Sequence, residues 1–176
     1  WSFFDKSFYV KTNLVGEYNL DNVLAAVAVG KFFGINAEYI SAALEEYEPK
    51  NNRSQFERTE RNDLIIDAYN ANPTSMKASL EFFSKIPSEM PKTVILGEMK
   101  ELGDISEEEH KKLLKFVQKQ PFQKIYLVGE IFKSLSPCDT VMEDFEVKNR
   151  KCFYSENVDE LCIELQKNPQ NGHYIL

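Results

Sequence analysis

The sequence predicts an α/β fold: a Rossmann-like, doubly wound and mainly parallel sheet, preceded by a mostly helical segment. From Phe56 onward, short apolar runs typical of buried strands alternate with longer stretches whose apolar residues recur at helical spacing. Strands that alternate with helices form βαβ units, in which the strands lie parallel. Before Phe56 the pattern is mostly helical. This change of pattern indicates two parts of the chain.

The first part is predicted to contain a strand followed by two helices. Residues 8–14 alternate apolar and polar side chains and predict a half-exposed strand. Asn19 stands where a helix N-cap is expected, and a small-residue helix follows from Leu20 to Phe33, with Gly34 as its stop. A second helix presents Ile40, Ala43, Leu44 and Tyr47 on one face and ends before Pro49.

A polar linker then separates the two patterns. Residues 49–57 read PKNNRSQFE, and we place a domain boundary at Arg53, which divides the chain into residues 1–52 and 53–176. Arg53 therefore stands at the hinge. Its rigid fork of N–H donors suits an anion, although a surface arginine more often has no such role.

The second part opens with a hairpin whose second strand ends at Asp67, in the segment LIIDAYNANPTSM, residues 64–76. Asn72 suits an N-cap and Pro73 the first position of a helix that runs to Lys85. The loop between strand and helix lies at the carboxyl end of the strand, where open α/β sheets bind ligands. Its polar residues Asp67, Tyr69, Asn70 and Asn72 exceed what a turn needs, although a cap with an Asx-turn explains them equally well.

Further strands are predicted at residues 93–96, 124–128, 151–154 and 173–176. Helices are predicted at residues 106–119 and after the N-cap Asn157. Ser106 and Glu109 have the spacing of a capping box, and His110 falls on the apolar stripe of its helix, which favours a packed histidine over a ligand. The loop after residue 96 carries Glu98, Lys100, Glu101 and Asp104, a pattern more typical of a solvated loop than of catalysis. It lacks the spacing of a phosphate-binding P-loop.

Composition limits the classes of function. With 176 residues, 43% apolar and 28% charged, the chain resembles an ordinary globular protein. A net charge of −7 argues against a nucleic-acid binder. Because no apolar run approaches the roughly 20 residues of a membrane span and no signal peptide opens the chain, we expect a cytoplasmic protein that does not bind membranes. We also expect a monomer.

Cysteine usage gives no metal site. Cys138, Cys152 and Cys162 have no metal-like spacing, and the chain has 2 histidines, so we predict reduced thiols and no metal ligands. The chain starts at Trp1 and ends at Leu176 inside an apolar run, and we expect it to be a fragment of a longer protein.

Four segments in order resemble the Mur ligases, most closely their MurF type. They are GEYNLDNVLAA at residues 16–26, NNRSQ at 51–55, DAYNANPTSM at 67–76 and LGEMKELGDISEEEH at 96–110. The resemblance implies that residues 1–52 are the end of a central ATP-binding domain. Residues 53–176 would then be the C-terminal domain, truncated at its last strand. The P-loop, the Mg²⁺ ligands and a modified lysine are expected upstream.

The resemblance also implies roles for individual residues. Asn22 contacts adenine with Asn19 beside it, Arg53 reaches the ATP phosphates, and Asp67 holds the ribose hydroxyls. Tyr69, Asn70 and Asn72 line the cleft toward nucleotide and dipeptide. Arg53 is the one residue expected to act catalytically, by stabilising the charge of the moving phosphoryl group. Many relatives carry histidine before the first asparagine, where this chain has Tyr18, which leaves a ligand role for that position open.

The implied reaction is the ATP-dependent joining of D-alanyl-D-alanine to UDP-N-acetylmuramoyl-tripeptide in peptidoglycan synthesis, through an acyl phosphate. The cofactors are ATP and Mg²⁺, and this piece alone is expected to be inactive. Two alternatives stay open: a stand-alone doubly wound binding or regulatory module without catalysis, and a Mur ligase that adds a different amino acid.

Overall fold

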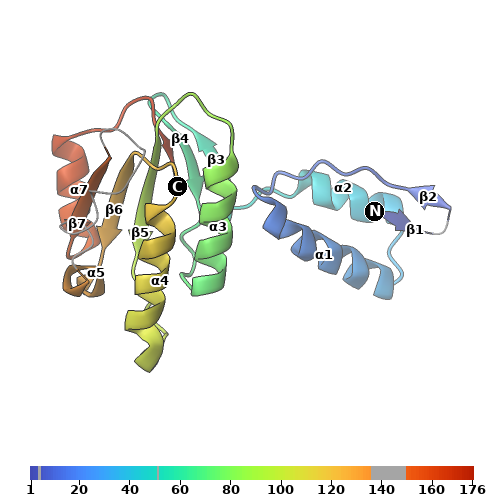
Figure 1. The fold of residues 1–176 in the computed structure, drawn as a ribbon. Helices are drawn as coiled ribbons and strands as arrows, with labels where there is room; N and C mark the ends of the chain where they lie inside the picture. The colour runs from blue at the N-terminus through green and yellow to red at the C-terminus, as the bar shows by residue number, and fades with distance from the viewer. Residues whose placement is uncertain (4, 51, 136–149) are drawn as a thin grey trace.

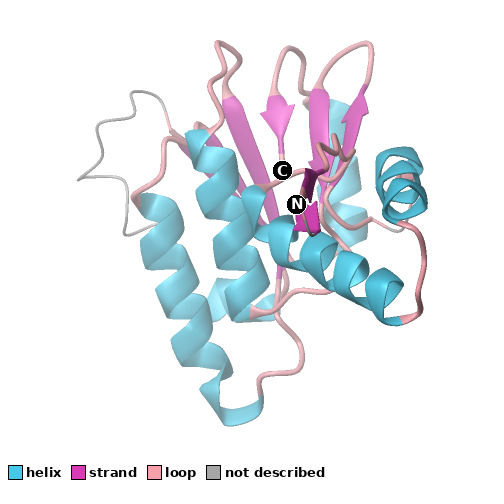
Figure 2. Cartoon of the chain, turned by 90° about the vertical axis from the view of Figure 1, so that its right-hand side faces the viewer, coloured by secondary structure: helices cyan, strands magenta, loops and turns pink. Residues whose placement is uncertain are grey.

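The computed structural model describes residues 1–3, 5–50, 52–135 and 150–176, and it consists of two parts joined by a short linker (Figure 1). We call residues 1–50 the helical lobe, Asn52 to Ser54 the linker, and the described residues from Gln55 onward the sheet domain. In Figure 2 the helical lobe faces the viewer, with the sheet domain behind it. Within the described ranges, every helix is too short or too polar to cross a membrane.

Two helices make up most of the helical lobe: α1, Leu20–Phe32, and α2, Ala37–Glu46. The turn η1, Glu17–Asn19, leads into α1, and the short strands β1, Ser2–Phe3, and β2, Lys6–Ser7, pair near the N-terminus. The helices approach closely, because a Cβ atom on Gly30 of α1 would lie 2.9 Å from the Ile40 side chain of α2. Both predicted helices are confirmed.

The predicted strand over residues 8–14 is wrong. Phe8 exchanges backbone hydrogen bonds with Trp1, but no strand is formed over residues 8–14, and the Asn13 amide donates to the carbonyl oxygens of Glu45 and Tyr47 at 3.0 and 3.3 Å. It therefore satisfies backbone acceptors left unpaired at the end of α2. A strand needs a neighbouring strand to pair with, and alternation of apolar residues does not provide one. Here the segment contacts the end of helix α2 instead.

The sheet domain holds a six-stranded sheet in the order β3-β4-β8-β5-β6-β7. The hairpin β3, Gln55–Arg58, and β4, Asp63–Ile66, is antiparallel, and its strands are tied by an Arg58–Asp63 ion pair with an N–O distance of 3.0 Å. All other pairings are parallel. The remaining strands are β5 at Lys92–Gly97, β6 at Lys124–Val128, β7 at Lys151–Ser155 and β8 at Tyr174–Ile175. The predicted mainly parallel sheet is confirmed.

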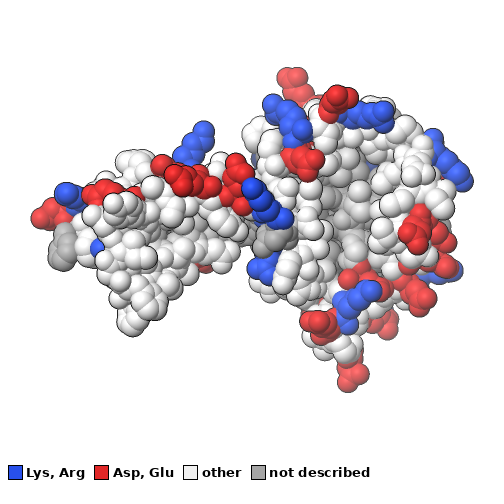
Figure 3. Space-filling model, turned by 180° about the vertical axis from the view of Figure 1, so that it is seen from behind, with Lys and Arg blue, Asp and Glu red and all other residues white. Residues whose placement is uncertain are grey.

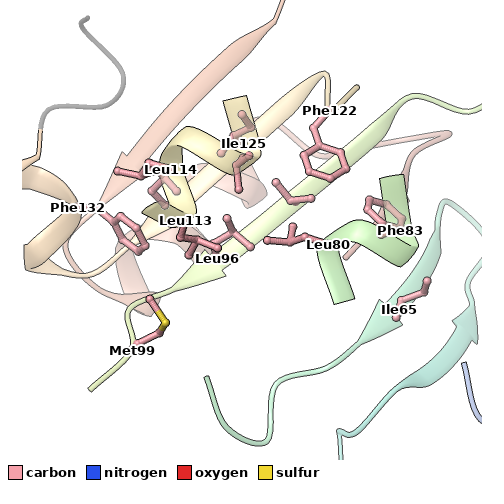
Figure 4. Close-up of a cluster of buried hydrophobic side chains, with 13 residues drawn as sticks. Ile65, Leu80, Phe83, Leu96, Met99, Leu113, Leu114, Phe122, Ile125 and Phe132 are labelled. Carbon is pink, nitrogen blue, oxygen red and sulfur yellow. The ribbon is translucent and has the colours of Figure 1, made fainter. Parts of the chain in front are cut away.

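Helices cover both faces of this sheet. On one face, alternate strand residues such as Val94, Leu96, Ile125 and Leu127 pack under α3, Pro73–Lys85, α4, Ser106–Gln118, and α5, Glu130–Ser134 (Figure 4). The intervening residues Tyr126 and Val128 pack on the other face against Leu161 of α7, Val158–Lys167. Because successive side chains of a strand point to opposite faces of the sheet, the same strands contribute to two hydrophobic cores.

Helix starts follow the predicted caps in two of four cases, Asn72 and Asn157, and the cap predicted at Asn19 fails as described below. Asn72 accepts from the Ser75 N–H at 2.9 Å, and Asn157 accepts from the Glu160 N–H at 3.0 Å. The predicted capping box at Ser106 and Glu109 is wrong, because the turn η2, Gly103–Ile105, leads directly into α4 and leaves Ser106 inside the helix without a side-chain cap.

The cysteine prediction is correct in part. Cys162 is a free, exposed thiol. Cys152 is disulfide-bonded, so the expectation of a reduced thiol is wrong there. Cys138 lies outside the described residues.

Candidate functional site

A cavity of about 690 Å³ opens at the carboxyl edge of the sheet. Its walls come from the segment after β4, as predicted for that polar loop, and from the first turns of α3 and the segment after β5. Its polar lining residues include Asp67, Tyr69, Asn70, Glu98, Lys100 and Glu101. Acidic, basic, amide and phenol groups therefore meet in one hollow large enough for a small ligand.

Asp67 lies at the tip of β4, half-buried, and both of its carboxylate oxygens accept hydrogen bonds from other parts of the chain. Oδ1 accepts from the backbone N–H of Ser54 at 3.2 Å, and Oδ2 accepts a long hydrogen bond from the Tyr18 hydroxyl at 3.5 Å. One donor comes from the linker and the other from the helical lobe. The orientation of this carboxylate therefore depends on both parts of the molecule.

Ser54 is the centre of this junction and is 4% exposed. Its hydroxyl lies 3.0 Å from the Tyr18 oxygen and accepts from the Asn19 amide at 3.0 Å. Its carbonyl accepts from the Val15 N–H at 3.3 Å. No role was predicted for Ser54, because a serine in a polar linker is common and its partners lie far away along the chain.

Asn19 is buried and does not cap α1, so the cap interpretation of this residue is wrong. Its amide nitrogen donates to the Val15 carbonyl at 2.8 Å and to Ser54, while its oxygen accepts from the Asn22 amide at 3.0 Å. Asn22 is exposed one turn into α1. A hydrogen-bonded path thus connects Asn22 to Asp67 through Asn19, Ser54 and Tyr18.

Tyr18 bridges the helical lobe and the sheet domain. Its ring lies edge-on to Phe82 of α3, with 6.1 Å between ring centroids. Burial raises the pKa of the phenol, the hydrogen bond to Ser54 opposes that shift, and the negative charge of Asp67 adds to it. The hydroxyl is therefore a proton donor at neutral pH.

Arg53 stands between two residues with left-handed backbone, Asn52 at φ 56° and Ser54 at φ 48°. Its guanidinium stacks 3.6 Å above the Tyr69 ring, which is 62% exposed. The carbonyl of Asn52 accepts from the N–H groups of Ala68 and Tyr69 at 2.8 and 3.2 Å. The linker is thereby attached to the loop after β4, and Arg53 lies over that loop.

The two loop asparagines differ in their surroundings. Asn70 is exposed and lines the cavity. Asn72 is absent from the lining, and its side-chain oxygen is engaged as the cap of α3. The structure therefore brings Asn70 to the cavity and places Asn72 at its margin, with the amide N–H₂ as its remaining polar group.

The loop after β5 contributes more than its sequence indicated. Glu98, Lys100 and Glu101 line the cavity, although a solvated loop was the favoured interpretation. His110 anchors this loop from below, because its Nε2 accepts from the Met99 N–H at 3.0 Å and its Nδ1 donates to the Ser106 carbonyl at 2.7 Å. The prediction of a packed, satisfied histidine is confirmed, with His110 0% exposed.

Comparison with known proteins places this arrangement in a family. Residues 52–176 match the family model "Mur ligase, glutamate ligase domain". A curated relative, the UDP-N-acetylmuramoyl-tripeptide--D-alanyl-D-alanine ligase of Bacillus subtilis, is 30% identical over 173 residues. That match covers 98% of this chain and 36% of the relative, so the chain spans about a third of its length.

Solved structures agree with this match. A crystal structure of MurF from Acinetobacter baumannii is 27% identical, with a TM-score of 0.74, covering 94% of this chain and 36% of that one. A MurF ligase from Thermotoga maritima in complex with ADP shares the fold at 21% identity and a TM-score of 0.68, covering 96% of this chain and 36% of that one. From its sequence match and its fold, the chain belongs to the Mur ligase family.

Proposed function

We propose that this chain is part of an ATP-dependent ligase that joins D-alanyl-D-alanine to UDP-N-acetylmuramoyl-tripeptide in peptidoglycan synthesis. Its relatives from B. subtilis and A. baumannii carry the names of that ligase. The observation that supports the proposal best is the hydrogen-bonded path from Asn22 to Asp67, beside Arg53. It gathers three groups suited to a nucleotide at one junction.

The groups at the junction fit the parts of ATP. Asp67 is half-buried and accepts one hydrogen bond on each oxygen, so each oxygen retains acceptor capacity for a ribose hydroxyl. Asn22 presents an exposed amide, which suits the edge of adenine. Arg53 presents an exposed guanidinium, the group best matched to phosphate oxygens.

In this proposal Arg53 stabilises negative charge as a phosphoryl group moves to the tripeptide carboxylate, forming an acyl phosphate that the dipeptide amine attacks. ATP supplies that phosphoryl group. Because Arg53 lies in the linker, rotation of the two parts changes its distance from the cavity, and closure both completes the site and excludes water. Its stacking on Tyr69 holds the guanidinium near the cavity meanwhile.

Tyr69 and Asn70 line the cavity after β4, and Asn72 stands beside it. We assign these three residues to the cleft for nucleotide and dipeptide. The proposed reaction also uses Mg²⁺, and we propose that residues upstream of this chain bind the ion. The part of the chain described here has no group of three or more His, Cys, Asp or Glu able to hold a metal ion.

We further propose that residues 1–52 are the end of a central ATP-binding domain and residues 53–176 a C-terminal domain of a monomeric, cytoplasmic enzyme. Large apolar side chains of α1 are exposed, including Leu20 at 59%, Leu24 at 46% and Phe32 at 84%. Figure 3 shows wide stretches of the helical lobe without charged side chains. Such a helix needs further protein to cover it.

The substrate proposal is tested with the full-length protein. Phosphate release is measured with UDP-N-acetylmuramoyl-tripeptide and either D-alanyl-D-alanine or single amino acids. We expect turnover with the dipeptide and at most traces with single amino acids. Preference for a single amino acid would identify a different Mur ligase, and no phosphate release with any amine would contradict the ligase proposal.

The nucleotide proposal is tested by Asp67→Ala in the same protein. Loss of two hydrogen bonds to a charged acceptor raises the KM for ATP by about tenfold or more. Glu57→Ala, on the exposed strand β3, is the control and leaves KM unchanged. A wild-type KM in Asp67→Ala removes this residue from the nucleotide site.

A further inference from the structure

The hydrogen-bond network at the junction has one direction. The Val15 carbonyl can only accept, so the Asn19 side chain must turn its NH₂ group toward it, and the second N–H then points to the Ser54 oxygen. The Asp67 carboxylate can only accept, so the Tyr18 hydroxyl donates its one proton to Oδ2 at 3.5 Å. The Ser54 hydroxyl, 3.0 Å from the Tyr18 oxygen, is then the donor of that pair. The path thus ends on the carboxylate.

This path fixes how Asp67 is presented. A carboxylate accepts up to about four hydrogen bonds, two on each oxygen. Ser54 N–H takes one position on Oδ1 and the Tyr18 hydroxyl one on Oδ2, from the side of the linker and helical lobe. With both oxygens held from that side, the carboxylate cannot rotate freely, and its remaining acceptor positions are directed at a ligand that carries two neighbouring hydroxyls.

The ring of Tyr18 makes packing contacts, and its hydroxyl makes hydrogen bonds. The ring packs edge-on to Phe82 and also sits close to Gly16, where a Cβ atom would lie 2.2 Å from Tyr18 Cε1. These contacts hold η1 against α3 without the hydroxyl. The hydroxyl alone reaches Ser54 and Asp67.

We propose that Tyr18 is a positioning residue for the ribose of the bound nucleotide: its hydroxyl, supported by Ser54, holds the Asp67 carboxylate toward the two ribose hydroxyls. This inference rests on the proposed function. It assigns to the Tyr18 hydroxyl the task of holding the Asp67 carboxylate in place by a hydrogen bond, which requires a hydrogen-bond donor at this position. Tyr18 acts through Asp67 and makes no contact with the reacting atoms.

The test compares ATP with 2′,3′-dideoxy-ATP, which lacks both hydroxyls, in the full-length enzyme. The readout is the ratio of kcat/KM for the two nucleotides. Tyr18→Phe keeps the ring and removes the hydroxyl, and it lowers this ratio roughly three- to tenfold, mostly through KM for ATP. A role in packing alone would leave the ratio unchanged. Tyr9→Phe, at a side chain that is 97% exposed, is the matched control and keeps the wild-type ratio.

Two further variants separate the possible failures. Asp67→Asn lowers the ratio at least as much as Tyr18→Phe if Asp67 holds the ribose. If Asp67→Asn lowers the ratio and Tyr18→Phe does not, the Tyr18 inference is wrong and the nucleotide site stands. If Asp67→Asn itself leaves the ratio unchanged, Asp67 does not hold the ribose, and the role proposed for Tyr18 is wrong as well.

Ser54→Ala keeps the backbone N–H that donates to Asp67 and removes the supporting hydroxyl. It shifts the ratio in the same direction as Tyr18→Phe. A wild-type ratio in Ser54→Ala excludes the relay through Ser54.

Discussion

Gly129, directly after β6, is the residue at which a single methyl group would disturb the candidate site most directly. Its backbone has φ of 123°, and a Cβ atom there would lie 2.4 Å from Glu98 Oε2. We expect Gly129→Ala to lower the free energy of unfolding by about 2–3 kcal/mol, chiefly because a backbone with φ 123° and ψ 152° is essentially restricted to glycine, while the flexible Glu98 side chain moves aside. Urea unfolding of the full-length protein measures it.

Gly172→Ala is the matched control for that measurement. Gly172 also has a positive φ, 70°, but a Cβ atom there would meet nothing within 4 Å. It therefore carries the backbone strain alone, about 1 kcal/mol. Equal losses in the two variants would show that neither the more restricted backbone of Gly129 nor its contact with Glu98 adds to ordinary positive-φ strain.

At Arg53, the contribution of the positive charge and that of the planar guanidinium can be measured separately. Arg53→Lys keeps the positive charge but loses the planar fork of donors and most of the stacking on Tyr69. We expect kcat for phosphate release to fall about 100-fold in Arg53→Ala and less in Arg53→Lys, because charge stabilisation in the transition state is the role proposed. A change in the KM for ATP with kcat intact would assign Arg53 to binding instead.

At the scale of elements, the start of β8 depends on a buried histidine. His173 is 7% exposed, and its Nδ1 lies 2.7 Å from the Thr93 hydroxyl on β5. Burial, with a smaller contribution from the positive charge of Lys124, lowers the pKa of His173 below its ordinary value of 6.5. In the unfolded chain this histidine therefore binds a proton at a higher pH than in the folded one.

The sign of the pH dependence follows from that difference. Below about pH 6.5 the unfolded state binds more protons at this position, so stability falls as pH drops toward the lowered folded pKa. We expect His173→Asn to reduce this part of the pH dependence, measured as unfolding free energy between pH 5 and 7 against the wild-type protein. Parallel curves for the two proteins would show that His173 does not contribute.

Elements with local signals were predicted well. The helix from Pro73 to Lys85 has its cap, its proline and its apolar stripe within one stretch of sequence, and its predicted bounds are those observed. The strand over residues 8–14 failed because pairing depends on a partner that the segment itself does not encode. The capping box failed because the turn η2 runs directly into α4 and places Ile105, which has no side-chain acceptor, at the N-cap position.

For the candidate site too, the features with a local sequence signal could be predicted and those that depend on distant contacts could not. Its polar loops after β4 and β5 were predictable, because both follow strand ends in a parallel sheet. The network around Ser54 was not, because it joins residues 35 and 13 positions apart in sequence, Asn19 with Ser54 and Ser54 with Asp67. Such contacts follow from how the helical lobe meets the linker, which no local pattern describes.

At the scale of the whole molecule, the helical lobe has more apolar surface than a free-standing lobe should. Phe32 and Phe33 are 84% and 73% exposed, and Val29 is 57% exposed. Patches of this kind mark interaction surfaces in folded proteins. If the lobe is the end of a larger domain, as we propose, these side chains are buried in the complete protein.

A charge at Phe32 tests this burial in both contexts. In the full-length protein, Phe32→Glu places a charge in an apolar interface and lowers the melting temperature by several degrees, in line with a cost of a few kcal/mol. In the isolated 176-residue chain the same change leaves the melting temperature nearly unaltered and reduces binding of a hydrophobic dye, because the side chain is exposed there. Tyr39→Glu on α2, at a site 73% exposed, checks that a new charge in the lobe is not harmful in itself. If Phe32→Glu leaves the full-length protein as stable as the wild type, Phe32 faces solvent there too, and the assignment of the lobe to a larger domain is wrong.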